Sequence, residues 1–282
     1  ELRRLDPLNL TVPPISQTEL LRWETIQLHS RACRLAEVAK CYLGELMTNS
    51  SNRHLISSEE VGPLLLRGAN INYYVLLDEP KQGSPLFLRE ADYLKEYASD
   101  IRSTHHQGPR VGFQESSPID NWRRLIACWI PPGHYCVHKI RYFAPDARYD
   151  LFALLALLNS TLEDWRFGLT STNNSINAYE MDALPVPRFE RLTGEDVNDV
   201  DWDRWTSILA GGESSAVQWE EQVHRIIEST PLNAVSWPDA IHDALAAAGK
   251  EMSRLGEARQ CAMSRYAEWL FARLQVDRER FS

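Results

Sequence analysis

The chain has 282 residues, of which 44% are hydrophobic and 24% are charged, and its formal net charge is −9. This composition is typical of a globular protein with a core. Its longest apolar run, at 151–158, is far shorter than the roughly 18 residues that a membrane-spanning helix needs, so we expect a cytoplasmic protein without a membrane anchor.

The five cysteines are odd in number and include no CxxC pair. This pattern argues against a disulfide framework or a structural zinc site and favours a reducing compartment. The chain opens on Glu1 without Met or a signal-peptide pattern, so we expect a fragment of a longer polypeptide.

The first part of the chain, 17–47, is predicted to be mostly helical. Its apolar residues recur at roughly helical intervals, and Ser16 with Glu19 has the spacing of a capping box. A polar loop follows at 48–52.

From 54 to 150, short apolar runs alternate with proline and glycine, which predicts strands. We expect strands at 64–66, 73–77, 110–114, 124–130 and 134–142, and a helix at 88–98. The last two strands are predicted to meet at a tight turn, Pro131-Pro132-Gly133.

The remainder is predicted to be mainly helical. We expect a helix over 150–167, a polar loop over 170–175, a short turn or helix over 177–183 and an acidic linker over 195–203. From 203 onward the pattern is helical, with breaks near 211–212 and 231–238. The final helix, 239–277, is expected to bend or break near Gly249 or Gly256. The fold class is therefore α+β: an irregular, curved, mostly antiparallel sheet with flanking helices, followed by a helical C-terminal region.

Five short segments occur in an order that resembles the target-recognition (TaqI-like C-terminal specificity) domain of adenine-N6 DNA methyltransferases. The same domain is found in fused type II restriction–modification enzymes and in phage-exclusion methyltransferases. The segments are 35–56, 64–71, 109–114, 154–160 and 181–187; for example, 154–160 matches an L-x-x-L-L-N-S pattern. The chain departs from the family at Asn49-Ser50, where Thr-Gly-Asn is usual, and at Asn70, where Asp is usual.

The resemblance implies a specificity module for duplex DNA rather than an enzyme. Neither Pro-Pro pair, at 13–14 and 131–132, lies in the motif that holds a flipped adenine, and no glycine-rich turn for S-adenosylmethionine is present. We therefore expect no catalytic residue, metal or cofactor in this chain. S-adenosylmethionine is expected in a methyltransferase lobe upstream or on a partner. The predicted domains are a helical lead-in (1–48), a DNA target-recognition domain (49–190) and a helical C-terminal region (191–282).

Candidate DNA contacts come from basic and amide side chains. Residues 101–148 carry seven Lys or Arg against three acids, although the chain is acidic overall. Arginine can bridge guanine O6 and N7, and glutamine can bridge adenine N6 and N7. The predicted contacts are Asn52, Arg53, Arg67, Arg110, Gln114, Arg123, Arg124, Lys139, Arg141, Thr170, Thr172, Asn173 and Asn174. Arg67 has a structural ion-pair role as its alternative. We further predict that Arg110, Arg123, Arg124, Lys139 and Arg141 form one positive face.

Two other functions stay open. A nuclease would need a carboxylate cluster, and Glu79-Pro80-Lys81 matches only the E-x-K core of such sites. His134, Cys136 and His138 alternate along a predicted strand and would share one face, which permits a metal site but favours a polar or packed surface. A protein-interaction module would instead use the acidic C-terminal helices.

Overall fold

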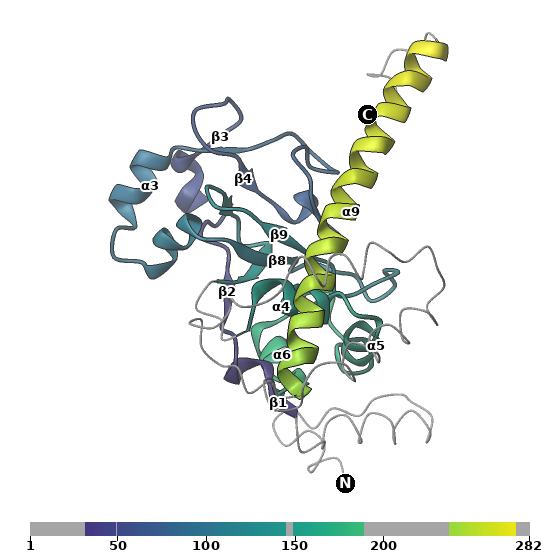
Figure 1. Ribbon diagram of the computed structural model, residues 1–282. Coiled ribbons are helices and arrows are strands. Elements are labelled where there is room, and N and C mark those ends of the chain that lie inside the picture. The colour runs from purple at the N-terminus through teal and green to yellow at the C-terminus, as the bar shows by residue number, and fades with distance from the viewer. Residues whose placement is uncertain (1–31, 49, 145–148, 189–236, 275–282) are drawn as a thin grey trace.

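The structure is a computed structural model that describes residues 32–48, 50–144, 149–188 and 237–274. It is a mixed α+β fold, as predicted (Figure 1). The largest sheet has four antiparallel strands in the order β2-β11-β8-β9. These strands are β2 (Cys41–Leu43), β11 (Ile140–Phe143), β8 (Arg110–Gln114) and β9 (Ala127–Ile130).

The described part of the chain also contains four strand pairs. Three are antiparallel: β1 (Ala32–Arg34) with β12 (Pro185–Pro187), β3 (Ile56–Ser57) with β7 (Phe87–Leu88), and β5 (Ile71–Asn72) with β6 (Val75–Leu76). The fourth, β4 (Leu65–Leu66) with β10 (Tyr135–Cys136), is parallel. Because β10 pairs with β4 rather than with β9, the predicted 124–142 hairpin does not form.

The helices lie around the strands. They are η1 (Leu35–Glu37), η2 (Ser50–Leu55), η3 (Gly68–Asn70), α3 (Glu90–Glu96), η4 (Ile101–Gln107), α4 (Leu151–Leu158), α5 (Thr161–Thr170), α6 (Ala178–Asp182) and α9 (Trp237–Leu274). Among the described residues, no stretch has both the length and the hydropathy needed to span a bilayer.

Side chains alternate between the two faces of the four-stranded sheet along each strand, and each face packs against a hydrophobic cluster. Val111 and Phe113 of β8 pack in the cluster that contains Leu154 and Leu158 of α4. On the other face, Cys128 and Ile130 of β9 pack in a cluster with Ile71. The sheet is therefore a central layer, with α4 on one side and the β5–β6 hairpin on the other.

Two helix predictions are wrong. Residues 32–47 form β1, η1 and β2 rather than a helix, while 17–31 lies outside the described residues. The predicted helix over 150–167 is two helices, α4 and α5, because Asn159 leaves the helical pattern. Its side chain accepts a hydrogen bond from the backbone N–H of Ala127 (3.0 Å) and donates one to the Ala127 carbonyl (2.9 Å), which ties the break to β9.

Helix α9 is uninterrupted over Trp237–Leu274, so the predicted break at Gly249 or Gly256 is absent. Its first part packs along α4, and its later part extends beyond the body of the fold (Figure 1). A Cβ atom at Gly249 would lie 2.2 Å from the Phe152 carbonyl oxygen, so glycine permits the close approach of the two helices. The other predicted C-terminal elements, at 203–236, lie outside the described residues.

Candidate nucleic-acid interface

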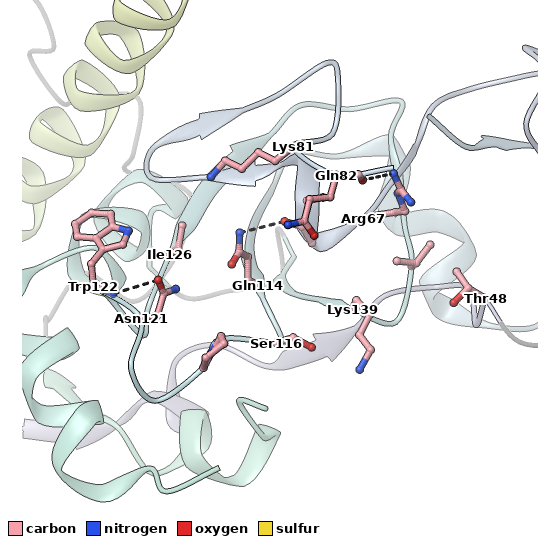
Figure 2. Close-up of a pocket in the computed structure, with 14 residues that line it drawn as sticks. Thr48, Arg67, Lys81, Gln82, Gln114, Ser116, Asn121, Trp122, Ile126 and Lys139 are labelled. Atoms are coloured by element: carbon pink, nitrogen blue, oxygen red, sulfur yellow. Dashed lines mark hydrogen bonds between the residues drawn. The ribbon is translucent and has the colours of Figure 1, made fainter. Parts of the chain in front are cut away.

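A hollow of about 730 Å³ opens at one end of β8. It lies between the 80–84 turn, η3, the loop that follows β8 and the residues that precede β11 (Figure 2). Fourteen residues line it, and we call it the polar hollow: Thr48, Arg67, Gly68, Ala69, Lys81, Gln82, Gln114, Ser116, Pro118, Asn121, Trp122, Ile126, Val137 and Lys139.

The lining of the polar hollow contains three cations and no carboxylate. The Lys81 ammonium donates to the amide oxygen of Asn72 (2.9 Å), a neutral partner, so its charge is not compensated by that contact. Partial burial lowers the pKa of Lys81 from its ordinary value. Lys139 differs, because its ammonium lies 3.1 Å from the Glu115 carboxylate. Among the described residues, the lining thus combines a lysine without an acidic partner with one that is paired.

Arg67 is a structural residue of the hollow wall. Its guanidinium donates to the carbonyls of Gln82 (2.9 Å) and Ser84 (2.8 Å), both neutral acceptors. Between them Gly83 has a positive φ of 72°, which glycine adopts without strain and which lets the turn curve around the guanidinium. The ion-pair role considered for Arg67 is not found among the described residues: its partners are neutral carbonyls, and it holds the 80–84 turn against η3. Its contact with DNA stays a prediction.

Gln114 ends β8 and reaches into the hollow with a fixed side chain (Figure 2). Its amide nitrogen Nε2 donates to the carbonyls of Gly68 (3.1 Å) and Ile71 (2.8 Å). Since a side-chain NH₂ has two N–H donors, both are used by the protein. The Oε1 atom takes no part in these two hydrogen bonds and can accept one from another group.

Trp122 marks the rim of the hollow and is 69% exposed. Its indole contacts the ring of Tyr73 edge to face, with 5.8 Å between the ring centroids. The neighbouring side chain of Asn121 accepts a hydrogen bond from the Trp122 backbone N–H (3.1 Å) (Figure 2). The rim therefore presents a large aromatic surface on a loop whose backbone is held in place.

Arg110 and Asn52 are placed away from solvent, so their predicted DNA contacts are wrong. Arg110 is 0% exposed and forms a buried ion pair with Glu45, and it also donates to the His134 carbonyl. Asn52 is buried; it accepts from the Met47 N–H and donates to the Tyr97 hydroxyl. Both side chains hold the core together.

Arg123 and Arg124 are also buried, so the DNA contacts predicted for them are wrong too. Arg123 donates to the carbonyls of Asn159 (2.8 Å) and Ser160 (3.0 Å), where α4 ends. Arg124 donates to the carbonyls of Ser171 and Asn173. These two arginines fasten loops to the sheet.

The predicted single positive face is therefore wrong. Three of its five members are buried with internal partners, and a fourth, Arg141, is half-buried and donates to the Ile176 carbonyl (2.8 Å). Of the five, Lys139 alone lines the polar hollow.

The remaining predicted contacts lie at the surface. Arg53, Thr172, Asn173 and Asn174 are exposed, and Thr170 is half-buried. Asn174 also has a structural task, because its backbone carbonyl accepts from the Ser117 N–H (2.8 Å) and its side chain accepts from the Ile119 N–H (3.3 Å). The predicted 170–175 loop thus supports the loop that carries Trp122. DNA contact by these residues stays a prediction.

The structure does not place His134, Cys136 and His138 on the shared face that the sequence predicted. Because β10 spans only Tyr135–Cys136, His134, Cys136 and His138 do not share one strand face. Cys136 is buried, while the His138 ring accepts from the Thr48 N–H (3.4 Å). Within the described residues, no three His, Cys, Asp or Glu side chains are grouped as a metal site would require.

Sequence reasoning missed Lys81, Gln82, Asn121 and Trp122 as lining residues. In the sequence Lys81 belongs only to the nuclease-like Glu79-Pro80-Lys81 motif, and the others lie in loops without a recognisable pattern. The one available signal was polar and aromatic residues beside predicted turns, which is weak because most turns are polar.

No protein-family model and no curated protein sequence matches the chain. Similar solved structures include an HsdS subunit from Thermoanaerobacter tengcongensis (14% identity, TM-score 0.35), which covers 84% of this chain and 50% of that one. A second is the type IIG restriction endonuclease BpuSI (12% identity, TM-score 0.35), with 84% and 32% covered. A third, from a type I R-M system, has 16% identity and a TM-score of 0.36, with 91% and 49% covered. The chain spans half or less of each of these structures.

Proposed function

We propose that this chain is the DNA target-recognition part of a restriction–modification enzyme that methylates adenine at N6. The polar hollow is its duplex-binding surface. The observation that carries the proposal is the contrast in charge: a chain of net charge −9 has a hollow lined by three cations and no carboxylate. The order of the sequence segments that resemble a target-recognition domain supports the same function.

The division of labour follows from the chemistry of the lining. Lysine ammonium groups bind phosphates as point charges and position the duplex. Amides such as Gln82, Gln114 and Asn121 can contact base edges, and the exposed Trp122 offers an apolar face. Methyl transfer, with S-adenosylmethionine, would belong to a lobe outside residues 1–282.

A protein-interaction role for α9 is a second candidate. Its exposed face carries Met252, Leu255, Met263, Tyr266 and Trp269. Over Trp237–Leu274 the sequence has five acids and five Lys or Arg, so this helix has no net charge. If α9 binds a partner, it does so through apolar contact rather than as the acidic surface that the sequence suggested.

Two substitutions, one in the hollow and one beside it, test the proposal through opposite effects on DNA affinity. Lys81→Met removes an uncompensated cation, so binding should weaken about fivefold at 0.15 M salt, and the slope of log K against log salt should fall by about one. Glu115→Gln frees Lys139 from its carboxylate, so binding should tighten by a similar factor. The measurement is fluorescence anisotropy of the full chain with a mixed-sequence duplex over 0.05–0.2 M salt.

The matched control is Lys95→Met, since Lys95 is exposed on α3 and does not line the hollow. Its affinity and salt slope should equal those of the wild type. Equal effects of the Lys81 and Lys95 substitutions, or no binding by any variant, would refute the polar hollow as a duplex-binding surface.

A further inference from the structure

We infer that Gln114 recognises a base through Oε1 alone, as a hydrogen-bond acceptor, and therefore selects a base with an exocyclic amine in the major groove: adenine N6 or cytosine N4. This inference rests on the proposed function and specifies what one residue of the polar hollow reads. It replaces the two-bond contact to adenine that the sequence suggested.

The orientation of the amide is set by the protein. Nε2 donates to two backbone carbonyls, those of Gly68 and Ile71, at 3.1 and 2.8 Å. Rotating the amide by 180° would place Oε1 against the same two carbonyls, so three acceptors would face one another without a donor. The hydrogen-bond network therefore decides which atom is nitrogen.

The two carbonyls are themselves held in place. Asn70, which lies between them in the chain, is buried. Its Oδ1 accepts from the Arg67 N–H (2.9 Å), and its Nδ2 donates to the Leu77 carbonyl (2.9 Å). The backbone of η3 and β5 is thereby fixed beneath Gln114. Release of the nitrogen would remove the Gln114 donor from both carbonyls, of which that of Gly68 also accepts from the Ile71 N–H.

Base chemistry then separates two modes of recognition. Bidentate recognition of adenine needs a protein group that donates to N7 and another that accepts from the N6 amine. Since both N–H groups of Gln114 are engaged, only the acceptor remains. Oε1 can accept from adenine N6 or cytosine N4, and it would repel guanine O6 and thymine O4, which are acceptors themselves. Among the described residues, the structure gives Oε1 no hydrogen-bond partner, so it is free for this contact.

The experiment begins with duplexes that the full wild-type chain selects from a random-sequence pool. Adenines in a selected duplex are replaced one at a time by purine, which lacks the N6 amine, or by 7-deazaadenine, which lacks N7. Cytosines are replaced by 2-pyrimidinone, which lacks the N4 amine. At one position, loss of the amine should weaken binding about tenfold, the lower range for a base contact. If that base is adenine, replacing N7 there should change the affinity of the wild type and of a Gln114 variant by the same factor.

The variant Gln114→Met assigns the effect to this residue in a double-mutant cycle. The variant should no longer distinguish the amine-deleted base from the normal one at that position. Gln107→Met is the matched control, because Gln107 is exposed at the end of η4 and does not line the hollow. It should leave the discrimination at that position intact.

Three outcomes are distinguishable. Equal losses on deleting N6 and N7 from the base coupled to Gln114 would show a bidentate contact and overturn the inference. Wild-type selection with no amine position coupled to Gln114 would overturn it while the proposed function stands. If the wild-type chain enriches no sequence, the proposed function fails first. The comparison of purine with 7-deazaadenine needs only the wild-type chain, so it holds even if Gln114→Met does not fold.

Discussion

Glu45→Gln is expected to lower the free energy of unfolding by about 3–5 kcal/mol, as measured by urea denaturation. Both members of the Glu45–Arg110 ion pair have side chains that are 0% exposed. Oε2 of Glu45 also accepts from the Cys136 N–H (2.8 Å). The substitution leaves the Arg110 charge in the interior without an anion, and glutamine places an N–H group where a second acceptor is needed.

The exposed pair Arg188–Glu37 is the matched control, since its side chains are 57% and 51% exposed. Glu37→Gln should change stability by less than about 1 kcal/mol. The double variant Glu45→Gln with Arg110→Met should be more stable than Glu45→Gln alone, because it removes the unpaired charge. A loss for Glu45→Gln no larger than that for Glu37→Gln would contradict the buried ion pair.

Glu163 is expected to make the protein less stable as the pH rises from about 5 to 7. Burial raises the pKa of Glu163 from 4.5 to about 7, and the nearby Arg166 lowers it only in part. Between these values the folded state holds a proton that the unfolded state has released, so folding is favoured below 4.5 and this contribution is lost through pH 7. The loss is of order 3 kcal/mol.

The variant Glu163→Gln isolates this contribution, because glutamine keeps the shape and cannot ionise. Its stability relative to the wild type should rise between pH 5 and pH 8 in urea denaturation. The control Glu257→Gln, on the exposed part of α9, should show a pH-independent difference from the wild type. A difference between wild type and Glu163→Gln that is constant with pH, or that falls as the pH rises, would contradict burial of an ionisable Glu163.

Local patterns in the sequence predicted the elements whose hydrophobic periodicity is clear. The strand 110–114 and the helix within 88–98 were found because alternation and helical spacing were clear. The helix predicted over 32–47 is wrong because the apolar spacing there fits strands as well as a helix. What decides it is tertiary: β2 pairs with β11. Gly44, directly after β2, lies so close to the segment before β11 that a Cβ would be 2.1 Å from the Val137 carbonyl oxygen.

The candidate site was harder to predict because composition does not show which arginines are buried. The basic excess over 101–148 suggested a surface for DNA. Arg110 instead pairs with Glu45, which is 65 residues away, and Arg123 donates to a carbonyl 36 residues away. The polar hollow is assembled from loops that are distant in sequence, so its lining became visible only in the folded chain.

A site-specific crosslink tests the central claim, that the polar hollow contacts duplex DNA. The photoreactive amino acid p-benzoylphenylalanine would replace Gln82, which is exposed on the hollow, or Arg259, which is exposed on α9. Each full-length variant is irradiated with a labelled mixed-sequence duplex, and the crosslinked fraction is measured. We predict a crosslink from position 82 that competitor duplex suppresses, and none from position 259. Equal crosslinking from both positions, or none from position 82, would contradict the claim.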